Sequence, residues 1–375
     1  MSGAQGPPLP LAAGVEGGDA GGVASVPTPG PASPSLAPPA SGRGATTDLA
    51  ATLTALLRGA GHDAEVRAAT PLSGGASSAT FAVDAVRGGA PWPLIFQRRE
   101  GAEGLPKVAQ AALQRLAGAH GVPVAEVVAV AAPDDGLGDG FVMAHVEGES
   151  LAPKWLKGDA FAAARAALTG QCAAALAALH AVPLAAVADL PLPGGSAREQ
   201  AERLYAHYRG FGVDEPVFDF AFVTLRDALP DAPATVVCHG DFRSGNVIVA
   251  PDDAAVPGLA AVLDWELAHL GDPHADLGWL CVNAWRFGQW RKPVGGFGER
   301  EALYAAYEAA GGRRVDRGLA HAFELFGTVK WGVSCLQLTD DHVSGRVRSV
   351  ERAAIGRRVS EVAADLLHLL KYGTI

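Results

Sequence analysis

The sequence predicts an α+β protein, with most of its strands early in the chain and mainly helices after them. Runs with the length and composition of strands, such as Leu94–Arg99 and Phe141–Gly148, lie before Asp159, except for one later pair. From Asp159 on the leucine spacing becomes helical, first over Phe161–Val182. With 375 residues, 49% of them hydrophobic, the chain is long enough for a two-lobed enzyme with a sizeable core.

Apolar spacing predicts helices elsewhere as well. Their ranges are Leu49–Arg58, Lys107–Ala119, Ala197–Arg209, Pro216–Leu229, Glu301–Ala310, Arg317–Thr339 and Val347–Lys371. Residues 1–45 differ from the rest, because they are mostly Gly, Ala, Pro and Ser with almost no large apolar side chains. Such a segment cannot bury enough surface to offset its chain entropy, so we expect a disordered extension.

Charge and cysteine spacing argue against several function classes. The net charge of −10 argues against a nucleic-acid binder and suits a cationic substrate. The four cysteines are far apart, which predicts reduced thiols and neither disulfides nor a zinc site. No uninterrupted apolar run reaches membrane-spanning length, and the N terminus lacks the pattern of a signal peptide. The sequence therefore predicts a soluble, cytoplasmic protein without a membrane partner; it does not predict the oligomeric state.

One stretch late in the chain concentrates polar residues around a predicted β-hairpin. The aliphatic runs Val247–Val249 and Leu259–Leu263 have strand length, and the segment between them contains two prolines, two aspartates and a glycine. An antiparallel hairpin would place Asn246, which enters the first strand, beside Asp264, which leaves the second. An amide oxygen beside a carboxylate suits a hard cation, so these two residues predict a Mg²⁺ site.

The same stretch supplies further carboxylates. Asp241 lies five residues before Asn246, and Glu266 lies two residues after Asp264. Phosphoryl transfer needs metal charge on the phosphate oxygens, an acceptor held in line and a carboxylate for the hydroxyl proton. We therefore predict Asp241 as the catalytic base, with Asn246, Asp264 and Glu266 as metal ligands. Each of these residues alone would also fit a turn or a helix cap; it is their combination that indicates function.

This spacing is similar to that of the protein-kinase catalytic loop and its later metal-binding Asp. In the segments HGDFRSGN, LDWELAHLGDPHADLGWL, CVNAWRFG and IGRRV, the chain resembles kinase-like phosphotransferases of the aminoglycoside phosphotransferase type. The branch most similar to it includes the kinase-like domains of some acyl-CoA dehydrogenases. The resemblance covers roughly Leu49 to the C terminus.

The resemblance implies a protein-kinase-like, two-lobed fold. Residues 46–146 would be a small, sheet-containing, nucleotide-binding N-lobe. Residues 147–375 would be a mainly helical C-lobe with the catalytic loop, metal site and substrate pocket. Arg243 would take the place of the catalytic-loop lysine and contact the γ-phosphate, and Asp276 would anchor the loop. The residues that the resemblance assigns to the nucleotide are Ser73, Gly74, Gly75, Ser77, Ser78, Arg98, Met143, Ala144 and Val146.

Two points near the nucleotide stay open. Because Arg98 and Arg99 are neighbours on a strand they face opposite ways, so only one enters the cleft, and Arg98 matches the pattern better. Kinase-like folds also carry a Glu on the following helix that pairs with the strand cation, and here Gln110 takes its place. A neutral amide offers a hydrogen bond without charge pairing, which leaves the effect on activity open.

The predicted function is transfer of the γ-phosphate of ATP to a hydroxyl of a small molecule, with Mg²⁺ as cofactor. A hydroxyacyl thioester and an aminoglycoside-like metabolite are the candidate acceptors. One alternative, suggested by Gln110, is a nucleotide-binding module without catalysis. A second is a metal-dependent phosphohydrolase, although two of its histidines fall in a predicted helix and its flanking loop. Its candidate ligands are His239, Asp241, Asp264, His269 and His274.

Overall fold

The computed structural model describes residues 43–72, 78–101 and 104–373, and these residues form one compact unit. The first part contains a five-stranded antiparallel sheet in the order β1-β2-β3-β5-β4. Its elements are α1 (Arg43–Gly59), β1 (Ala64–Leu72), β2 (Ser78–Arg87), β3 (Ala90–Arg99), α2 (Lys107–Ala119), β4 (Val127–Val130) and β5 (Gly140–Ala144). The expected sheet-containing first part is present, and helix α2 has the bounds that the sequence predicted.

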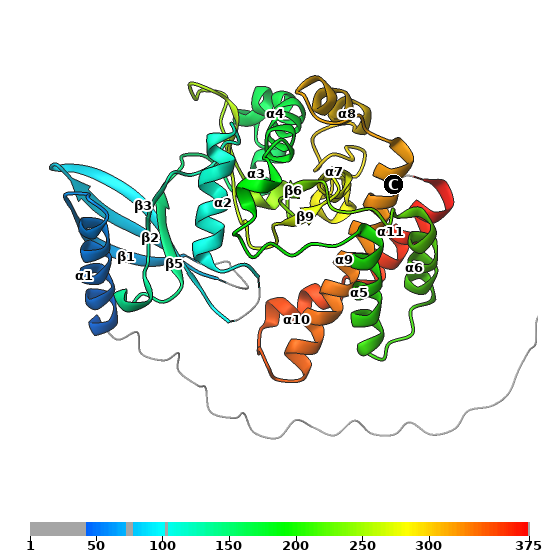
Figure 1. The fold of residues 1–375 in the computed structure, drawn as a ribbon, viewed down its shortest axis with the longest axis horizontal. Coiled ribbons are helices and arrows are strands. Elements are labelled where there is room, and N and C mark those ends of the chain that lie inside the picture. Colours follow the sequence, from blue (N-terminus) through cyan, green and yellow to red (C-terminus); the bar gives the residue numbers. More distant parts are fainter. Residues whose placement is uncertain (1–42, 73–77, 102–103, 374–375) are drawn as a thin grey trace, which may run out of the picture. The chain divides into compact units, whose positions relative to one another are not determined.

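The sheet lies between α1 and α2 (Figure 1), and the residues of β3 alternate between the two helices. Leu94 and Phe96 pack in one apolar cluster with Leu57 of α1. Ile95 packs against a second cluster that contains Ala111 of α2. Odd-numbered residues of β3 therefore face α2, and even-numbered residues face α1.

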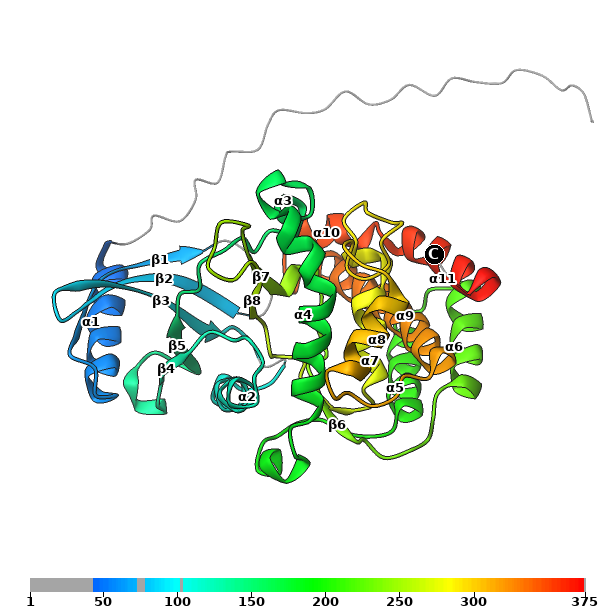
Figure 2. The ribbon, with the colours of Figure 1, turned by 90° about the horizontal axis from the view of Figure 1, so that it is seen from above.

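The second part is mainly helical (Figure 2) and contains two small two-stranded sheets, β6 with β9 (Figure 1) and β7 with β8. Its elements are α3 (Ala152–Lys157), α4 (Ala162–His180), α5 (Ala197–Gly210), α6 (Pro216–Ala228), β6 (Val236–Cys238), β7 (Val247–Ala250), β8 (Gly258–Val262), β9 (His269–Gly271), α7 (His274–Cys281), α8 (Arg300–Ala309), α9 (Arg317–Val343), α10 (Val350–Gly356) and α11 (Val359–Tyr372). Short 3₁₀ turns connect several of them.

The prediction of one helix over Val347–Lys371 is wrong, because the structure has α10 and α11 there. Helix α10 ends at Gly356, which packs directly against Thr339 of α9, so that a side chain at this position would collide with it. A close backbone approach of this kind depends on a residue distant in sequence, which apolar spacing does not reveal.

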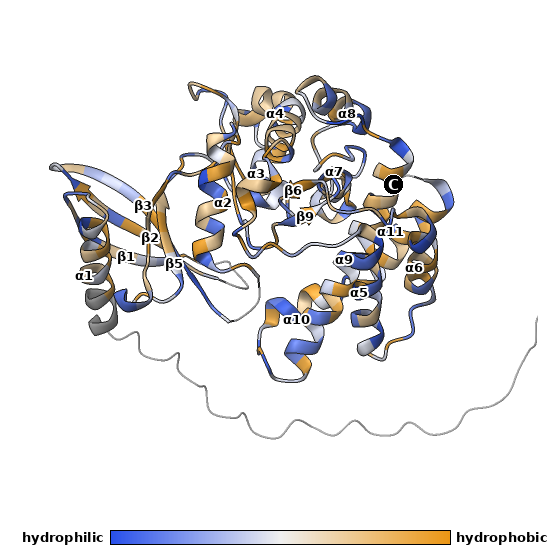
Figure 3. Ribbon diagram, viewed as in Figure 1, coloured by the Kyte–Doolittle hydropathy of each residue, from blue (hydrophilic) through white to orange (hydrophobic). Residues whose placement is uncertain are grey.

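Helix α4 is a core helix of the second part, and the colours of Figure 3 show that most of its residues are apolar. Leu168, Cys172, Leu176 and Leu179 are buried on it, as their spacing predicted. By length and composition alone, Asp159–His180 is also the one helix of the described residues that could cross a membrane. Its packing against α8 and β8 is typical of the core helix of a folded protein. All four cysteines are buried and free.

Candidate active site

The predicted hairpin is confirmed and forms the centre of the site. Strands β7 and β8 pair antiparallel, with Val247 opposite Val262. At the open end of the hairpin the backbone N–H of Leu263 donates to the carbonyl oxygen of Asn246 at 2.8 Å. The residue that follows Leu263 is Asp264, so the hairpin brings Asn246 and Asp264 together as the sequence predicted.

Asp241 lies at the same end and is held by three side chains. The amide nitrogen of Asn246 donates to Oδ2 of Asp241 at 2.6 Å and to its backbone oxygen at 3.0 Å. Oδ1 of Asp241 accepts from Nε1 of Trp279 at 2.8 Å and from Nε of Arg243 at 2.9 Å. The Arg243 guanidinium also stacks over the ring of Trp285. The catalytic-loop residues therefore converge on one buried carboxylate.

Asp264 has a backbone φ of 65°, a conformation that residues other than glycine rarely adopt and that is often found at functional sites. Burial raises the pKa of Asp264 to about 7, and repulsion from Glu266 and Asp241 adds to this effect. Because the amide nitrogen of Asn246 is committed to Asp241, its carbonyl oxygen is the atom left to bind a cation. Clustered carboxylates beside an amide oxygen are a donor set that fits Mg²⁺.

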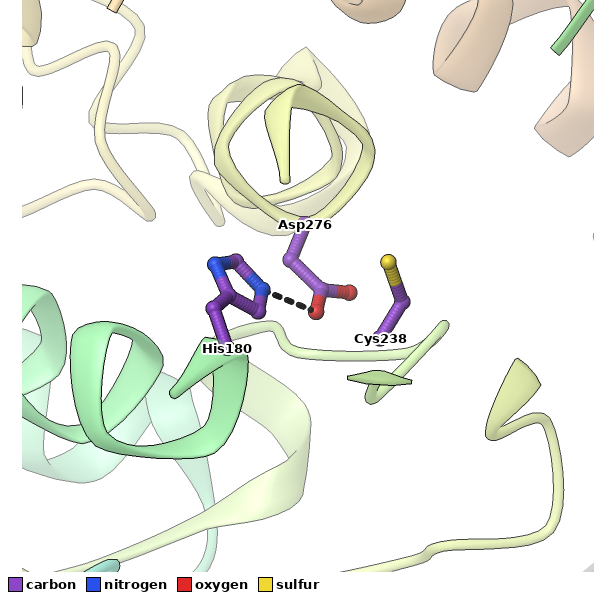
Figure 4. A group of neighbouring side chains, drawn as sticks. All are labelled: His180, Cys238 and Asp276. Atoms are coloured by element: carbon purple, nitrogen blue, oxygen red, sulfur yellow. Dashed lines mark hydrogen bonds and ion pairs between the residues drawn. The ribbon is translucent and has the colours of Figure 1, made fainter. Parts of the chain in front are cut away.

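A second carboxylate, Asp276 of α7, anchors the loop from behind. It accepts hydrogen bonds from the backbone N–H groups of His239 and Gly240, at 2.8 and 2.9 Å. It also pairs with Nε2 of His180 at 3.1 Å, and Cys238 lies beside the pair (Figure 4). Burial raises the pKa of Asp276, but the bonds from His180 and the backbone outweigh burial and bring it to about 2. The anchoring role that the resemblance implied for Asp276 agrees with this geometry.

Gly240 is required in this loop for two reasons. Its φ is +80°, and a Cβ atom there would collide with the backbone oxygen of Leu267. Lys330 of α9 donates to the carbonyl oxygen of Gly240 at 3.3 Å. Nothing in the sequence pattern linked Lys330 or Trp279 to the catalytic loop, because both contacts arise from the packing of α7 and α9.

The histidines proposed as metal ligands of a phosphohydrolase form hydrogen bonds to other groups of the protein. Both ring nitrogens of His239 bond to backbone groups of Asp241 and Leu263. His274 bonds to Asp272 and to the backbone N–H of Asp316. His269 is the first residue of strand β9 and pairs with Cys238 of β6. It therefore does not lie in the predicted helix or its flanking loop. Its Nδ1 bonds to the oxygen of Leu267. The geometry gives this alternative no support.

The structure places Arg98, the residue that the sequence favoured over Arg99 for the nucleotide, on the face of β3 that is turned away from α2. As an even-numbered residue of β3 it lies on the α1 face, where its guanidinium stacks over Phe81 at 5.8 Å. Gln97 takes the place on the α2 face, and its side-chain oxygen lies 3.4 Å from Nζ of Lys107. Arg99 also faces α2, and donates to the oxygen of Gly104. Motif matching does not fix which face of a strand a residue occupies, because the face depends on packing against α1 and α2.

The remaining nucleotide residues are only partly described. Ser73, Gly74, Gly75 and Ser77 lie outside the described residues, and Ser78 begins β2. In β5, Met143 is buried on the α2 face beside Ile95. The backbone N–H of Ala144 already donates to Glu126, whereas Val146 follows the strand and faces the same cluster as Met143.

Two cavities lie next to the catalytic loop, with volumes of about 310 and 450 Å³. The first is lined by Gly240 and Trp279, and the second by Gly104 and Glu266. Both share a set of mainly basic or polar residues from α5, β9 and α9. These shared residues are Gln200, Arg203, His269 and Lys330.

The fold is similar to that of solved kinase-like phosphotransferases. A candidate aminoglycoside phosphotransferase from Ralstonia eutropha is 23% identical, with a TM-score of 0.65, over 84% of this chain and 95% of that one. The GDP and kanamycin complex of APH(2″)-IIIa has a TM-score of 0.60 at 16% identity, over 84% and 97% of the chains. Spectinomycin phosphotransferase APH(9)-Ia, with ADP and spectinomycin, has a TM-score of 0.58 at 15% identity, over 86% and 99%. These likenesses confirm the predicted protein-kinase-like fold.

Curated relatives match shorter segments. Mouse acyl-CoA dehydrogenase family member 11 is 30% identical over 176 residues, which is 45% of this chain and 22% of that protein. Mouse family member 10 is 50% identical over 54 residues, which is 14% of this chain and 5% of that protein. The chain therefore matches only a small part of these relatives, in agreement with the resemblance to their kinase-like domains.

The model of one family, described as phosphotransferase enzymes, matches residues 68–315. This range includes the sheet, the hairpin, the catalytic loop and the anchoring helix α7. It covers more than half of the chain, and it confirms the prediction of a phosphotransferase with an alcohol group as acceptor. The chain belongs to the phosphotransferase enzyme family.

Proposed function

We propose that the protein transfers the γ-phosphate of ATP to a hydroxyl group of a small molecule, with Mg²⁺ as the metal ion. The observation that carries this proposal is the convergence of Asp241, Asn246 and Asp264 at the open end of one hairpin. Nucleotides in the similar solved structures, GDP in one and ADP in another, support the use of a nucleotide. Repulsion from Glu266 and Asp241 raises the pKa of Asp264, and a bound divalent cation would offset this repulsion.

In this proposal Asp241 orients the acceptor hydroxyl and takes its proton. The acceptor oxygen forms a bond to the γ-phosphorus, the bond from that phosphorus to the bridging oxygen breaks, and ADP leaves. Bonds from Trp279 and Asn246 hold the Asp241 carboxylate in one orientation, so little reorganisation is needed at the moment of transfer. Bound Mg²⁺ would supply positive charge to the phosphate oxygens, held by Asn246, Asp264 and Glu266.

The test uses ATP labelled in the γ-phosphate and the variant Asp241→Asn, which keeps the size of the side chain but removes the base. We expect transfer to the acceptor, or slow ATP hydrolysis without one, to fall by about a hundred- to ten-thousandfold. Asp253→Asn, exposed in the turn of the same hairpin, is the matched control and should behave as the wild type. Unchanged turnover in Asp241→Asn would contradict the proposal. Binding of ATP without turnover in the wild type would favour the non-catalytic nucleotide module.

The two cavities favour an acceptor with an anionic group. Arg203 and Lys330 line both of them. Of the acids, Asp276 in the first cavity is committed to the loop backbone, and Glu266 in the second is a proposed metal ligand. A polycationic aminoglycoside would be repelled by Arg203 and Lys330, and a hydroxyacyl thioester of coenzyme A, which carries phosphates, would be attracted. The partial similarity to acyl-CoA dehydrogenase family members supports the same class.

The acceptor class is tested with a hydroxyacyl thioester and with kanamycin, each beside labelled ATP. We expect transfer to the thioester, and about a tenfold higher KM for it in Arg203→Met, because one charge-assisted contact is lost. The KM for ATP should not change. Preferential transfer to kanamycin would contradict the anionic acceptor without contradicting phosphoryl transfer.

A further inference from the structure

In the part of the chain that the structure describes, the strand and helix positions next to the ammonium group of Lys107 hold neutral side chains, whereas the charged Arg99 farther along the α2 face of β3 pairs with Asp139 at 3.8 Å. In protein kinases a strand Lys holds the α- and β-phosphates and pairs with a helix Glu. Here Gln97 occupies the α2 face of β3, and Gln110 occupies α2. Both are neutral amides. Arg98 is on the opposite face of the strand, over Phe81.

A lysine from the helix, Lys107, fills the space between these two amides. Its Nζ donates to the side-chain oxygen of Gln110 at 3.0 Å and to that of Gln97 at 3.4 Å. Lys107 is the first residue of α2, yet its Nζ lies beside the side-chain end of a residue of strand β3. The backbone position of Lys107 is fixed as well, because its N–H donates to the carboxylate of Asp139 at 2.9 Å.

The electrostatics of Lys107 also relate it to the site. Only 1% of its surface is exposed, and this burial lowers its pKa, while attraction to Asp264 and Glu266 opposes the effect. Attraction to the predicted metal-binding acids indicates that the ammonium group lies near the region where the phosphates would be bound. Among the described residues, the side-chain hydrogen-bond partners of its ammonium group are the uncharged amides of Gln97 and Gln110.

We propose that Lys107 is the residue that binds the α- and β-phosphates of the nucleotide, in place of a strand lysine. This inference rests on the proposed function. A buried ammonium group with neutral partners interacts strongly with an anionic oxygen, because little water screens it. Gln97 and Gln110 act as positioning residues that direct the ammonium group into the cleft.

The first test compares ATP and adenosine binding to Lys107→Met by calorimetry in the presence of Mg²⁺. Loss of a charge-assisted hydrogen bond to phosphate should weaken ATP binding by about ten- to a hundredfold. Adenosine has no phosphate, so its affinity should stay at the wild-type value, which a merely misfolded pocket would not allow. Lys154→Met, a largely exposed lysine on α3, is the matched control and should bind both ligands normally.

The second test places a lysine on strand β3 in place of Lys107. The side chain of Gln97 already ends next to Nζ of Lys107, so Gln97→Lys in the Lys107→Met background should recover most of the ATP affinity. This double variant also keeps the test valid if the single variant is unstable. Arg98→Met is the competing variant, and under this proposal it should bind ATP as the wild type does.

Three outcomes would overturn the inference. Unchanged ATP affinity in Lys107→Met, with normal binding in the wild type, would contradict Lys107 and leave phosphoryl transfer intact. A large loss of ATP affinity in Arg98→Met, with none in Lys107→Met, would show that Arg98 and not Lys107 binds the α- and β-phosphates. If the wild type neither binds ATP nor transfers phosphate, the proposed function fails and this inference fails with it.

Discussion

The two sides of the candidate site are built in different ways. On the side of the catalytic loop, called the loop side here, Asp241 and Asp276 are buried carboxylates. Asp241 accepts hydrogen bonds from Asn246 and Trp279, and Asp276 accepts them from the loop backbone. On the sheet side, the ammonium group of Lys107 donates to two neutral amides, and Arg99 on the same face of β3 pairs with Asp139. Substitutions on the loop side should therefore affect catalysis and stability, and those on the sheet side mainly nucleotide affinity.

Apart from Asp241→Asn, the largest expected effect is on the loop side, in Asp264→Asn. The substitution removes a charged ligand from the proposed metal site while keeping the size of the side chain and its tolerance of positive φ. We expect turnover to fall by about a thousandfold, since metal charge on the phosphate supplies several kcal/mol of transition-state stabilisation. Turnover is measured with labelled ATP over a Mg²⁺ titration. A wild-type Mg²⁺ dependence in the variant would remove Asp264 from the metal site.

The anchoring acid Asp276 should affect stability more than any other residue of the loop side. The Asp276 carboxylate accepts from both backbone N–H groups of the loop and pairs with His180. The amide of Asp276→Asn has a single acceptor oxygen, so one of these N–H groups loses its hydrogen bond and His180 loses its carboxylate partner. We expect a loss of about 3 kcal/mol in the free energy of unfolding. Asp227→Asn, in an exposed ion pair, is the control and should be neutral.

The same anchor predicts how stability depends on pH. The pKa of Asp276 is about 2 in the folded protein and near 3.8 in the unfolded chain, so the folded state favours its charged form. This contribution, roughly 2.5 kcal/mol, is fully present above pH 4 and is lost as the pH falls toward 2. The difference in unfolding free energy between wild type and Asp276→Asn should therefore shrink below pH 4. A constant difference down to pH 2 would mean that the stability does not depend on the charge of Asp276.

The contrast between the two sides also explains what the sequence could predict. The hairpin, Asp241, Asn246 and Asp264 lie in one short stretch, where turn residues and strand alternation fix the register, so their convergence was predictable. On the sheet side, the face of β3 on which Arg98 lies depends on packing against α1 and α2, and Lys107 enters from a separate helix. Motif spacing carries no information on such contacts. Apolar spacing within one segment predicted most helices, but the break between α10 and α11 depends on a contact with α9 and was not predicted.

An intermediate effect is expected for Trp279→Phe, which removes one hydrogen bond from Asp241 while keeping an aromatic ring over which Lys330 stacks. A bond to a charged acceptor contributes about 1.5 kcal/mol, so kcat should fall about tenfold. The KM for ATP should stay unchanged, since Trp279 is not on the sheet side. Trp290→Phe, at an exposed tryptophan, should leave kcat at the wild-type value. An increase in the KM for ATP without a change in kcat would show that Trp279 does not orient the base.

The smallest effect is expected for Gln110→Glu, which restores the acid that protein kinases carry on this helix. In those enzymes the acid pairs with a strand cation, but here it would pair with Lys107 of the same helix, 3.0 Å away. The added negative charge would cancel part of the ammonium charge that faces the nucleotide, so we expect about a threefold higher KM for ATP. In the Lys107→Met background the same substitution should have a different effect, because the two positions interact directly. A lower KM in Gln110→Glu would instead mean that the amide weakens a charge pair on which nucleotide binding depends.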